Sequence, residues 1–407
     1  MSARARPVEG KFLTTPIKIM LVLWALGTVA GLYRFTQGLG AATAMSDGYP
    51  WGIWIAFDVV VGTGLASGGY AMALLVYVFN RGKFHPLVRP ALLTSFLGYS
   101  VAGVAVTFDL GRYWNMWRIP VAVGDWNHTS ILLEVALCMM AYTGVLFLEI
   151  SPALLERWEE AGKGGLAAFA KSARPKVERA LPFIVAVGLV LPTMHQSSLG
   201  SLLLVARTKV HGLWHTGLLP LLFLLTALAM GYAVIYFESI FSSVAFRRQL
   251  ETGLLAKLGV AVGGVIVAFL VLRFGALAAS GRLGLTVTSG IQSFVFWVET
   301  VLFAAAAWLF LQQRVRASAQ AQLQAALLAL FAGSLYRIDA FLTGFNPGTN
   351  WVYFPTLPEL LVTLGLVATE TMAYVWIVRK FPILAGVAMP ASRTAPTAAA
   401  AAQQGVS

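Results

Sequence analysis

Residues 254–279, LLAKLGVAVGGVIVAFLVLRFGALAA, decide the fold, because they form an apolar run that only Lys257 and Arg273 interrupt. An α-helix needs about 20 apolar residues to cross the hydrocarbon core of a bilayer. Nine further runs predict an all-α integral membrane protein of about ten transmembrane helices, arranged as two four-helix bundles with a flanking helix at each end. The other predicted helices are 16–35, 52–79, 90–109, 129–150, 180–200, 216–241, 291–311, 321–342 and 355–379.

The composition indicates that lipid is the solvent of this chain. Of the 407 residues, 58% are hydrophobic and 11% are charged, and the mean hydropathy is +0.76. A soluble domain of this length cannot bury so much apolar surface. The single cysteine, Cys138, excludes an internal disulfide, a four-thiolate iron–sulfur cluster and covalent attachment of c-type haem. Any redox centre that the chain itself holds must therefore be organic or a haem ligated by histidine, and we expect no other metal in this chain.

The basic residues indicate membrane topology rather than nucleic-acid binding. The formal net charge is +12, but Lys and Arg lie between the hydrophobic runs instead of clustering on a soluble face. If the N-terminus is cytoplasmic, most of the 29 basic residues fall on the inner side. Those left on the outer side are Arg34, Arg112, Arg118, Arg207, Lys209, Arg273, Arg282 and Arg337. We predict a multi-pass protein of the cell inner membrane with both termini cytoplasmic.

The same pattern divides the chain into three segments. We predict a cytoplasmic N-terminal segment at 1–15, a transmembrane domain at 16–385 and a disordered cytoplasmic tail at 386–407. The longest inner loop, at 152–177, is rich in Glu, Lys and Ala. We expect this loop to form an amphipathic helix on the membrane surface.

Several polar side chains are predicted to lie at one depth, close to the outer surface. Ionisable groups are costly inside a bilayer, so each is a candidate functional residue. Depth along each predicted helix can be estimated from the rise per residue. By this measure the outer part of four different helices contains Asp58, Glu134, the His195-Gln196 pair and Arg273. Pro192 can kink the helix just before His195. We predict a shared polar pocket; the alternative is a buried salt bridge of Asp58 or Glu134 with Arg273 that only holds the helices together.

A second group of carboxylates is predicted to lie deeper. Glu149, Glu238 and Glu370 fall in the inner half of their helices, and Glu299 falls near mid-membrane. Such a distribution could carry protons between an outer pocket and the inner water phase. For Glu149 and Glu238 the alternative is an interfacial position at a helix end.

The histidines argue against a haem. A membrane b-type haem needs two axial ligands facing one another from neighbouring helices. Of the five histidines, His85 lies in an inner loop and the others lie on the outer side, which excludes two stacked haems. One outer haem between His195 and His215 stays open as an alternative. We favour the use of these side chains as proton donors or hydrogen-bond partners, and expect no haem.

Seven segments in order along the chain resemble one known family. Those segments are GYPWGIWIAFDVVVGTGLASGGY (48–70), YVFNRGKFHPLVRPALL (77–93), DLGRYWN (109–115), LPTMHQSSLGSL (191–202), VLRFG (271–275), FNPG (345–348) and YFPTLPELL (353–361). They are similar to the NrfD/polysulfide-reductase membrane-subunit family, and within it to subunits of periplasmic nickel–iron hydrogenases of the second type. The resemblance runs from about residue 10 to about residue 385.

This resemblance implies a haem-free subunit that binds menaquinone or ubiquinone near the periplasmic face. Electrons would come from H₂ oxidised by the hydrogenase small and large subunits, through a periplasmic ferredoxin-like iron–sulfur subunit, and proton movement is associated with the family. The chain itself would not activate hydrogen. Carried onto this sequence, Asp58, Tyr99, Glu134 and His195 would handle the quinone and its protons, with Glu238 as an inner proton position. Gln196 and Arg273 complete the predicted quinone pocket, and Asp58, Glu134 and His195 are its predicted catalytic residues.

Two other functions fit the same sequence. The first keeps the quinone chemistry but serves a molybdopterin or sulfur-metabolism oxidoreductase, because partner choice depends on exposed loops. The second is a secondary transporter, although such folds show repeats around a mid-membrane site, and neither feature is visible here.

Overall fold

The structure, a computed structural model, describes residues 5–162 and 164–386, so the predicted tail lies almost entirely outside the described residues. Within those ranges it is all-α, without strands, and ten helical segments are long and apolar enough to cross a membrane. These segments are α1 (Thr15–Gln37), Trp54–Val78, Gly82–Asp109, α7 (Ile131–Glu160), α8 (Gly165–Val205), α9 (Leu219–Phe246), α10 (Thr252–Ala279), α12 (Ile291–Leu311), Ala319–Thr343 and α15 (Leu357–Lys380). The predicted number and order of spanning helices are confirmed.

Three of these segments are built from several pieces. The second consists of η1 (Trp54–Val61), α3 (Gly62–Leu65), α4 (Gly68–Ala73) and η2 (Leu74–Val78); the third of η3 (Gly82–Leu87) and α5 (Val88–Asp109); the ninth of α14 (Ala319–Ile338) and η7 (Asp339–Thr343). The connections hold the short helices α2 (Leu39–Ala42), η4 (Tyr113–Asn115), α6 (Arg118–Val121), η5 (Val123–Asp125), η6 (Arg207–Lys209), α11 (Leu285–Thr288) and α13 (Gln313–Arg316).

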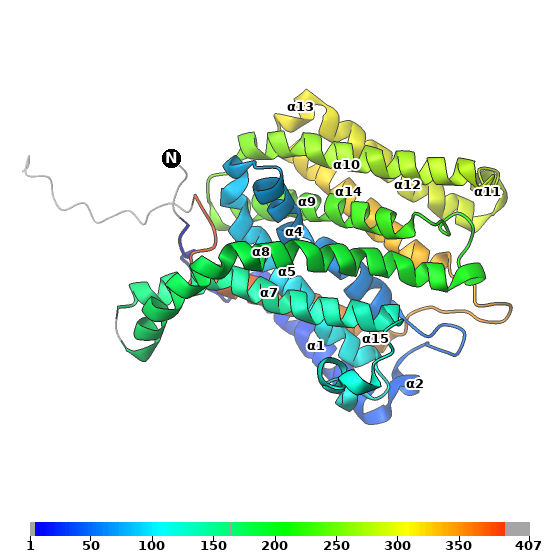
Figure 1. Ribbon diagram of the computed structural model, residues 1–407, viewed down its shortest axis with the longest axis horizontal. Helices are drawn as coiled ribbons and strands as arrows, with labels where there is room; N and C mark the ends of the chain where they lie inside the picture. Colours follow the sequence, from blue (N-terminus) through cyan, green and yellow to red (C-terminus); the bar gives the residue numbers. More distant parts are fainter. Residues whose placement is uncertain (1–4, 163, 387–407) are drawn as a thin grey trace, which may run out of the picture.

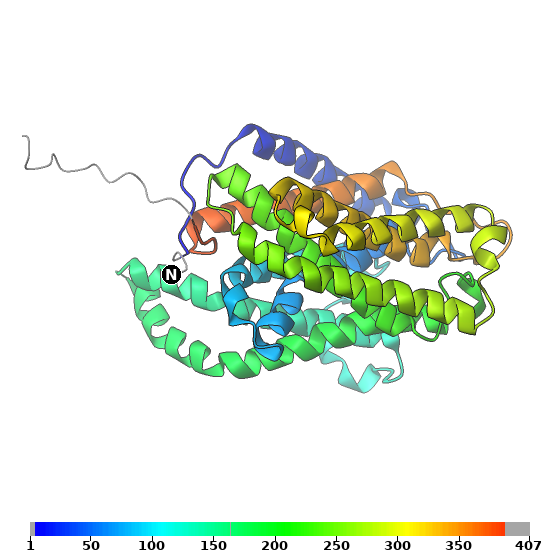
Figure 2. The ribbon, with the colours of Figure 1, turned by 90° about the horizontal axis from the view of Figure 1, so that it is seen from above.

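The helices form two bundles and a flanking pair. The second segment, α5, α7 and α8 pack together as the first bundle, while α9, α10, α12 and α14 form the second. Figure 1 shows the second bundle above the first, and Figure 2 shows α1 and α15 side by side along one edge. The helices from the two ends of the chain therefore pack against one another.

Close backbone approach explains the flanking pair. A Cβ atom added at Gly27 of α1 would lie 2.7 Å from the Cα atom of Gly365 on α15. Small residues that let two backbones approach are typical of helix contacts in membranes, where burial of apolar surface gives no driving force.

The second segment and α9 form the centre of the molecule. Buried positions make up 83% and 72% of their most apolar windows, more than in any other spanning segment. The second segment is irregular, since wide π-type turns in η1 and η2 flank a break at Ala66 and Ser67. Gly231 of α9 packs on this break, where a Cβ would lie 2.6 Å from the Ser67 carbonyl oxygen. Irregular helical turns of this kind often occur at functional sites.

Both described chain ends lie at the same end of the bundle, where the Arg6 N–H donates to the Leu384 carbonyl at 3.0 Å. We call this the terminal end, and we call the opposite end the far end. The far end is formed by loops 38–53, 110–130, 206–218, 280–290 and 344–356.

At the terminal end α7 and α8 extend past their neighbours as a helical hairpin (Figure 1). The inner loop at 152–177 is therefore mostly a continuation of two spanning helices and not a separate surface helix.

Candidate functional site

A buried arginine joins the two bundles in the far half of the molecule. Arg337 of α14 is fully buried, and its Nη1 donates to the Val60 carbonyl at 2.6 Å. Its Nη2 donates to Gln196 Oε1 and to the Phe223 carbonyl, both at 2.8 Å. Gly64 makes room for it, because a Cβ there would lie 3.0 Å from the guanidinium carbon. One side chain thus ties the second segment, α8 and α9 to α14.

Arg337 was counted among the outer basic residues and was not predicted as a site residue, although the predicted helix 321–342 contains it. Helical turns continue beyond Arg337 through η7 to Thr343, so the residue lies inside the segment. The apolar stretch AFL at 340–342, directly after Arg337-Ile338-Asp339, was the available signal. An arginine inside an apolar run is a functional candidate in its own right.

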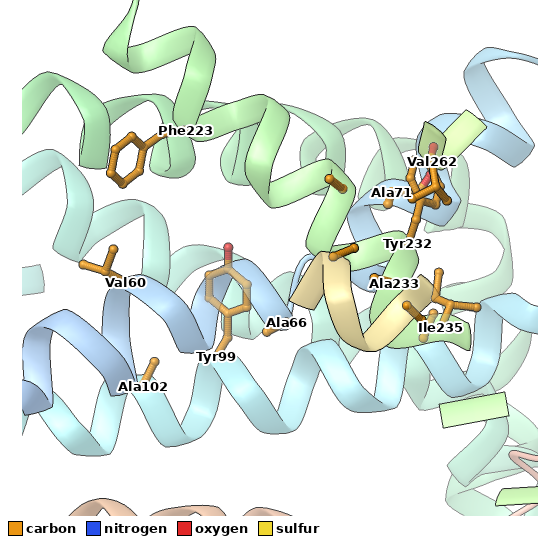
Figure 3. Packing of buried hydrophobic residues seen from close by; sticks show 14 of the residues in the cluster. Val60, Ala66, Ala71, Tyr99, Ala102, Phe223, Tyr232, Ala233, Ile235 and Val262 are labelled. Atoms are coloured by element: carbon orange, nitrogen blue, oxygen red, sulfur yellow. The ribbon is translucent and has the colours of Figure 1, made fainter. Parts of the chain in front are cut away.

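Tyr99 and His195 lie next to this network. Gln196 Nε2 donates to the Tyr99 hydroxyl at 3.2 Å, and the rings of Tyr99 and His195 are 5.5 Å apart between centroids. Figure 3 shows the Tyr99 hydroxyl pointing away from α5 toward the helix that carries Phe223. Both nitrogens of the fully buried His195 ring lack a hydrogen bond of normal geometry, although the Val135 backbone lies beside the ring. An unsatisfied buried donor or acceptor is costly, so this ring is suited to a ligand.

Glu134 lies near His195 through its contact with Ser198. Its carboxylate accepts a hydrogen bond from the Ser198 hydroxyl at 2.7 Å, and Ser198 follows His195 by three residues on the same face of α8. Val135, the residue beside His195, is the next residue along α7. Glu134 is half-buried and lies in the first turn of α7, nearer the helix end than the sequence analysis placed it. The half-buried Glu134 carboxylate and the buried His195 imidazole thus both lie where α7 packs against α8.

Arg273 is not part of this pocket, which corrects the prediction of one shared site. Its Nη2 donates to Glu299 Oε1 in an ion pair between α10 and α12, and both side chains are buried. Trp214 Nε1 donates to the same carboxylate oxygen at 3.2 Å. Because α10 packs against α9 and α12, Arg273 cannot reach Asp58 or Glu134 in the first bundle. Glu299, predicted as a proton carrier, is held by this pair.

Asp58 also lies outside the pocket, on the side facing α15. Its carboxylate accepts a hydrogen bond from the Thr363 hydroxyl at 2.7 Å. Glu370 is near enough to interact with Asp58 electrostatically. Asp58 was grouped with His195 only because the two residues lie at similar depth. In the structure they are separate, because the Asp58 side chain faces α15.

Two of the deeper carboxylates are buried within helices rather than placed at their ends. Glu238 of α9 accepts a hydrogen bond from the Tyr374 hydroxyl of α15. Glu149 of α7 faces Gly188 of α8, where a Cβ would collide with its Oε1, and that oxygen has no hydrogen-bond partner among the described residues. Both glutamates are only 9% exposed, which contradicts the interfacial alternative.

This chain belongs to the family described as "Polysulphide reductase, NrfD", which matches residues 41–346. It is a multi-pass membrane protein of that family. It is 40% identical over 391 residues to the "Probable Ni/Fe-hydrogenase 2 b-type cytochrome subunit" of Escherichia coli (strain K12), covering 94% of this chain and 96% of that protein. The resemblance seen in the sequence is thereby confirmed.

More distant relatives serve other oxidoreductases. The "Menaquinone reductase, integral membrane subunit" of Nitratidesulfovibrio vulgaris is 30% identical over 185 residues, which are 45% of this chain and 42% of that protein. The "Hdr-like menaquinol oxidoreductase integral membrane subunit" of Archaeoglobus fulgidus is 23% identical over 269 residues, covering 66% and 61%. Members of the family thus carry names of several different redox complexes.

The name of the E. coli relative contradicts the prediction that this chain holds no haem, because it calls that protein a b-type cytochrome subunit. That prediction rested on the lack of a facing histidine pair and on the haem-free subunit that the family resemblance implied. Among the described residues His195 offers two unpartnered nitrogens, which suits one axial ligand, but the aromatic ring against it is Tyr99. His215 instead lines a gap of about 10 Å³ with Trp214 and Arg273 in the second bundle. The residues therefore do not fit a haem held between His195 and His215.

His211 and His215 lie in the loop between α8 and α9, outside the spanning segments. Burial lowers the pKa of both side chains, and for His215 the nearby charge of Arg282 lowers it further. Burial in this loop therefore favours the neutral form of both imidazoles. The Arg282 Nη1 donates to the His215 carbonyl at 2.6 Å, which fixes this loop at the far end.

Proposed function

We propose that this chain is the quinone-reactive subunit of a respiratory hydrogenase complex in the cell inner membrane. Electrons from H₂ would reach menaquinone or ubiquinone through a periplasmic ferredoxin-like iron–sulfur subunit. The observation that carries the proposal is the buried His195 ring, which has no side-chain hydrogen-bond partner among the described residues and lies between Tyr99 and the α7 backbone at Val135, next to Glu134 in sequence. The names of the hydrogenase and menaquinone-reductase relatives support the same chemistry.

Quinone reduction requires two electrons and two protons, so the protein must bind both carbonyls and deliver protons to them. In this proposal His195 and the Tyr99 hydroxyl contact one carbonyl oxygen, in place of the partner that the His195 ring lacks. Glu134 supplies protons, because its half-buried position connects the buried ring to water at the far end. Arg337 and Gln196 hold Tyr99 in position through the hydrogen bonds at 2.8 and 3.2 Å.

Proton movement across the membrane would use the deeper carboxylates. Glu149 lies between α7 and α8, the helices that also carry Glu134 and His195, and its Oε1 is unpartnered among the described residues. Glu238 pairs with Tyr374 nearer the terminal end. We propose that these two glutamates and Glu370 form the inner proton positions, and that Asp58 lies on the outer side of the same path along α15.

The far end is suited to docking of the iron–sulfur subunit, and through it of the hydrogenase small and large subunits. Large apolar side chains are exposed on its loops, with Trp114 and Trp117 exposed by 60% and 66%, and Val352 and Phe354 by 83% and 78%. Exposed aromatic groups of this kind mark interaction surfaces. With both termini cytoplasmic, as the Lys and Arg distribution predicts, this end faces the periplasm.

The partner and the orientation can be tested on the purified complex. We expect stoichiometric nickel, and crosslinks from photoreactive groups at Trp117 and Phe354 to the iron–sulfur subunit. As a control, a photoreactive group at Phe169 in the α7–α8 hairpin should give no crosslink to that subunit. The Phe169 side chain is 58% exposed. Molybdenum in place of nickel would favour the molybdopterin alternative, and crosslinks from the hairpin alone would show that the orientation is wrong.

A further inference from the structure

A long groove lies on the second bundle at the terminal end, remote from the proposed quinone site. Its volume is about 710 Å³, and it lies between α10, α9 and the turn that follows the second segment. One wall is apolar and consists of Leu225, Val260, Ala261, Gly264, Val265 and Ala268. The lining includes four basic residues, Arg81, Lys83, Lys257 and Arg316, and no carboxylate.

The basic residues of this groove are available to a ligand. Arg81 follows η2, Lys83 lies in η3, Lys257 lies near the start of α10, and Arg316 ends α13, so all four are at the terminal end. In the part of the chain that the structure describes, none of them forms an ion pair. The Arg316 Nε atom is buried and has no hydrogen-bond partner there. Four cations without an ion pair at one mouth of an apolar groove favour the binding of an anion.

From this geometry we propose that the groove binds an anionic phospholipid, with its phosphate among the four basic side chains and an acyl chain along α10. Basic pockets between transmembrane helices are suited to anionic lipid headgroups. The dimensions agree with this occupant, since Lys257 to Ala268 spans roughly 16 Å of helix at 1.5 Å per residue. That length is about half the thickness of the hydrocarbon core, the depth of one leaflet.

Gly264 provides a test of the acyl part of the site. A Cβ atom at Gly264 meets nothing within 4 Å, so a larger side chain there enters the groove without disturbing the helices. Gly275, on the same helix and outside the groove, is equally open. Gly264→Leu should displace the acyl chain, whereas Gly275→Leu adds the same side chain elsewhere on α10.

Native mass spectrometry of the full-length chain in detergent, titrated with phosphatidylglycerol or cardiolipin, tests the proposal. We expect saturable binding of one lipid that phosphatidylcholine does not reproduce. Replacing Arg81, Lys83, Lys257 and Arg316 together by Gln should weaken binding at least about tenfold. The matched variant, with Lys11, Lys18, Arg247 and Arg314 changed to Gln, removes the same charge outside the groove and should bind normally.

Several results would overturn the lipid assignment. Equal weakening by the two charge variants would mean only general attraction to anionic surfaces. Loss of lipid binding on addition of inorganic phosphate, with no effect of Gly264→Leu, would identify a free anion as the ligand. Displacement of the lipid by menaquinone would instead make the groove a quinone site. Phosphatidylcholine binding as tightly as phosphatidylglycerol would also contradict the proposal.

Discussion

The two bundles treat their buried charges differently. In the second bundle Arg273 is paired with Glu299, and Trp214 donates to the same carboxylate. In the first bundle neither His195 nor Glu134 forms an ion pair among the described residues; the Val135 backbone lies beside the His195 ring, and Glu134 accepts a hydrogen bond from the Ser198 hydroxyl. Both clusters also hold buried polar atoms without a hydrogen-bond partner there, so the ion pair is what distinguishes them. A buried charge that meets an opposite charge can hold helices together, whereas the unpaired groups of the first cluster leave chemistry for a ligand. We therefore assign a structural role to the second cluster and a functional role to the first.

Arg337 connects the two bundles, so its removal should have the largest effect. Arg337→Met leaves Gln196 Oε1 and the carbonyls of Val60 and Phe223 without their donor, at about 1–3 kcal/mol for each unsatisfied group. We expect poor yield, a lower unfolding midpoint in detergent and quinone reduction reduced at least about a hundredfold. Arg337→Lys keeps the charge but not the fork of donors and should be intermediate. Normal stability and activity of Arg337→Met would mean that the bundles do not depend on this network.

The ion pair of the second bundle should behave as a structural element. Arg273→Met alone leaves the Glu299 carboxylate buried without its cation, and we expect destabilisation of about 3–5 kcal/mol. Arg273→Met combined with Glu299→Gln should recover most of that loss, measured as unfolding midpoints of the four proteins in a double-mutant cycle. Quinone reduction per folded molecule should stay near the unmodified value in the double variant. A loss of activity there at full stability would place the pair in the reaction.

The flanking pair should show the smallest effect, confined to stability. Gly27→Ala forces a methyl group to within 2.7 Å of Gly365 Cα, and we expect destabilisation of about 1–3 kcal/mol. Gly144→Ala in α7 is the control, because a Cβ there meets nothing within 4 Å. Both variants should keep quinone reduction per folded molecule. Equal stability of the two variants would show that α1 and α15 are not held by this contact.

The sequence predicted the helices well, because a spanning helix has a length fixed by the bilayer. The run at 254–279 became α10 at Thr252–Ala279, and the other nine runs also became helices. Depth was predicted less well, since Glu134 lies nearer the helix end than expected and Arg337, counted among the outer basic residues, is fully buried.

Which helix face each polar residue occupies was not predictable from depth. Asp58, His195 and Arg273 were grouped because they lie at similar heights, but they face α15, α5 and α12 respectively. A face depends on how neighbouring helices pack, and the irregular turns of the second segment shift the helical phase in a way that apolar runs do not reveal. The pairing of Glu134 with the His195 region was recovered because α7 and α8 are consecutive antiparallel neighbours.

The central claim is that Glu134 and His195 deliver protons to a quinone. It is tested most directly by comparing quinone reduction with reduction of an artificial dye that bypasses this subunit, using the purified complex. Glu134→Gln keeps the acceptor for Ser198 but removes the titratable proton, and His195→Ala removes the imidazole; Asp47→Asn, at an exposed carboxylate of the far end, is the control. For both site variants we expect unchanged assembly and dye reduction, with quinone reduction at least about tenfold lower, a barrier increase of about 1.4 kcal/mol. Normal quinone reduction in both, or failure of both to assemble, would contradict the assignment.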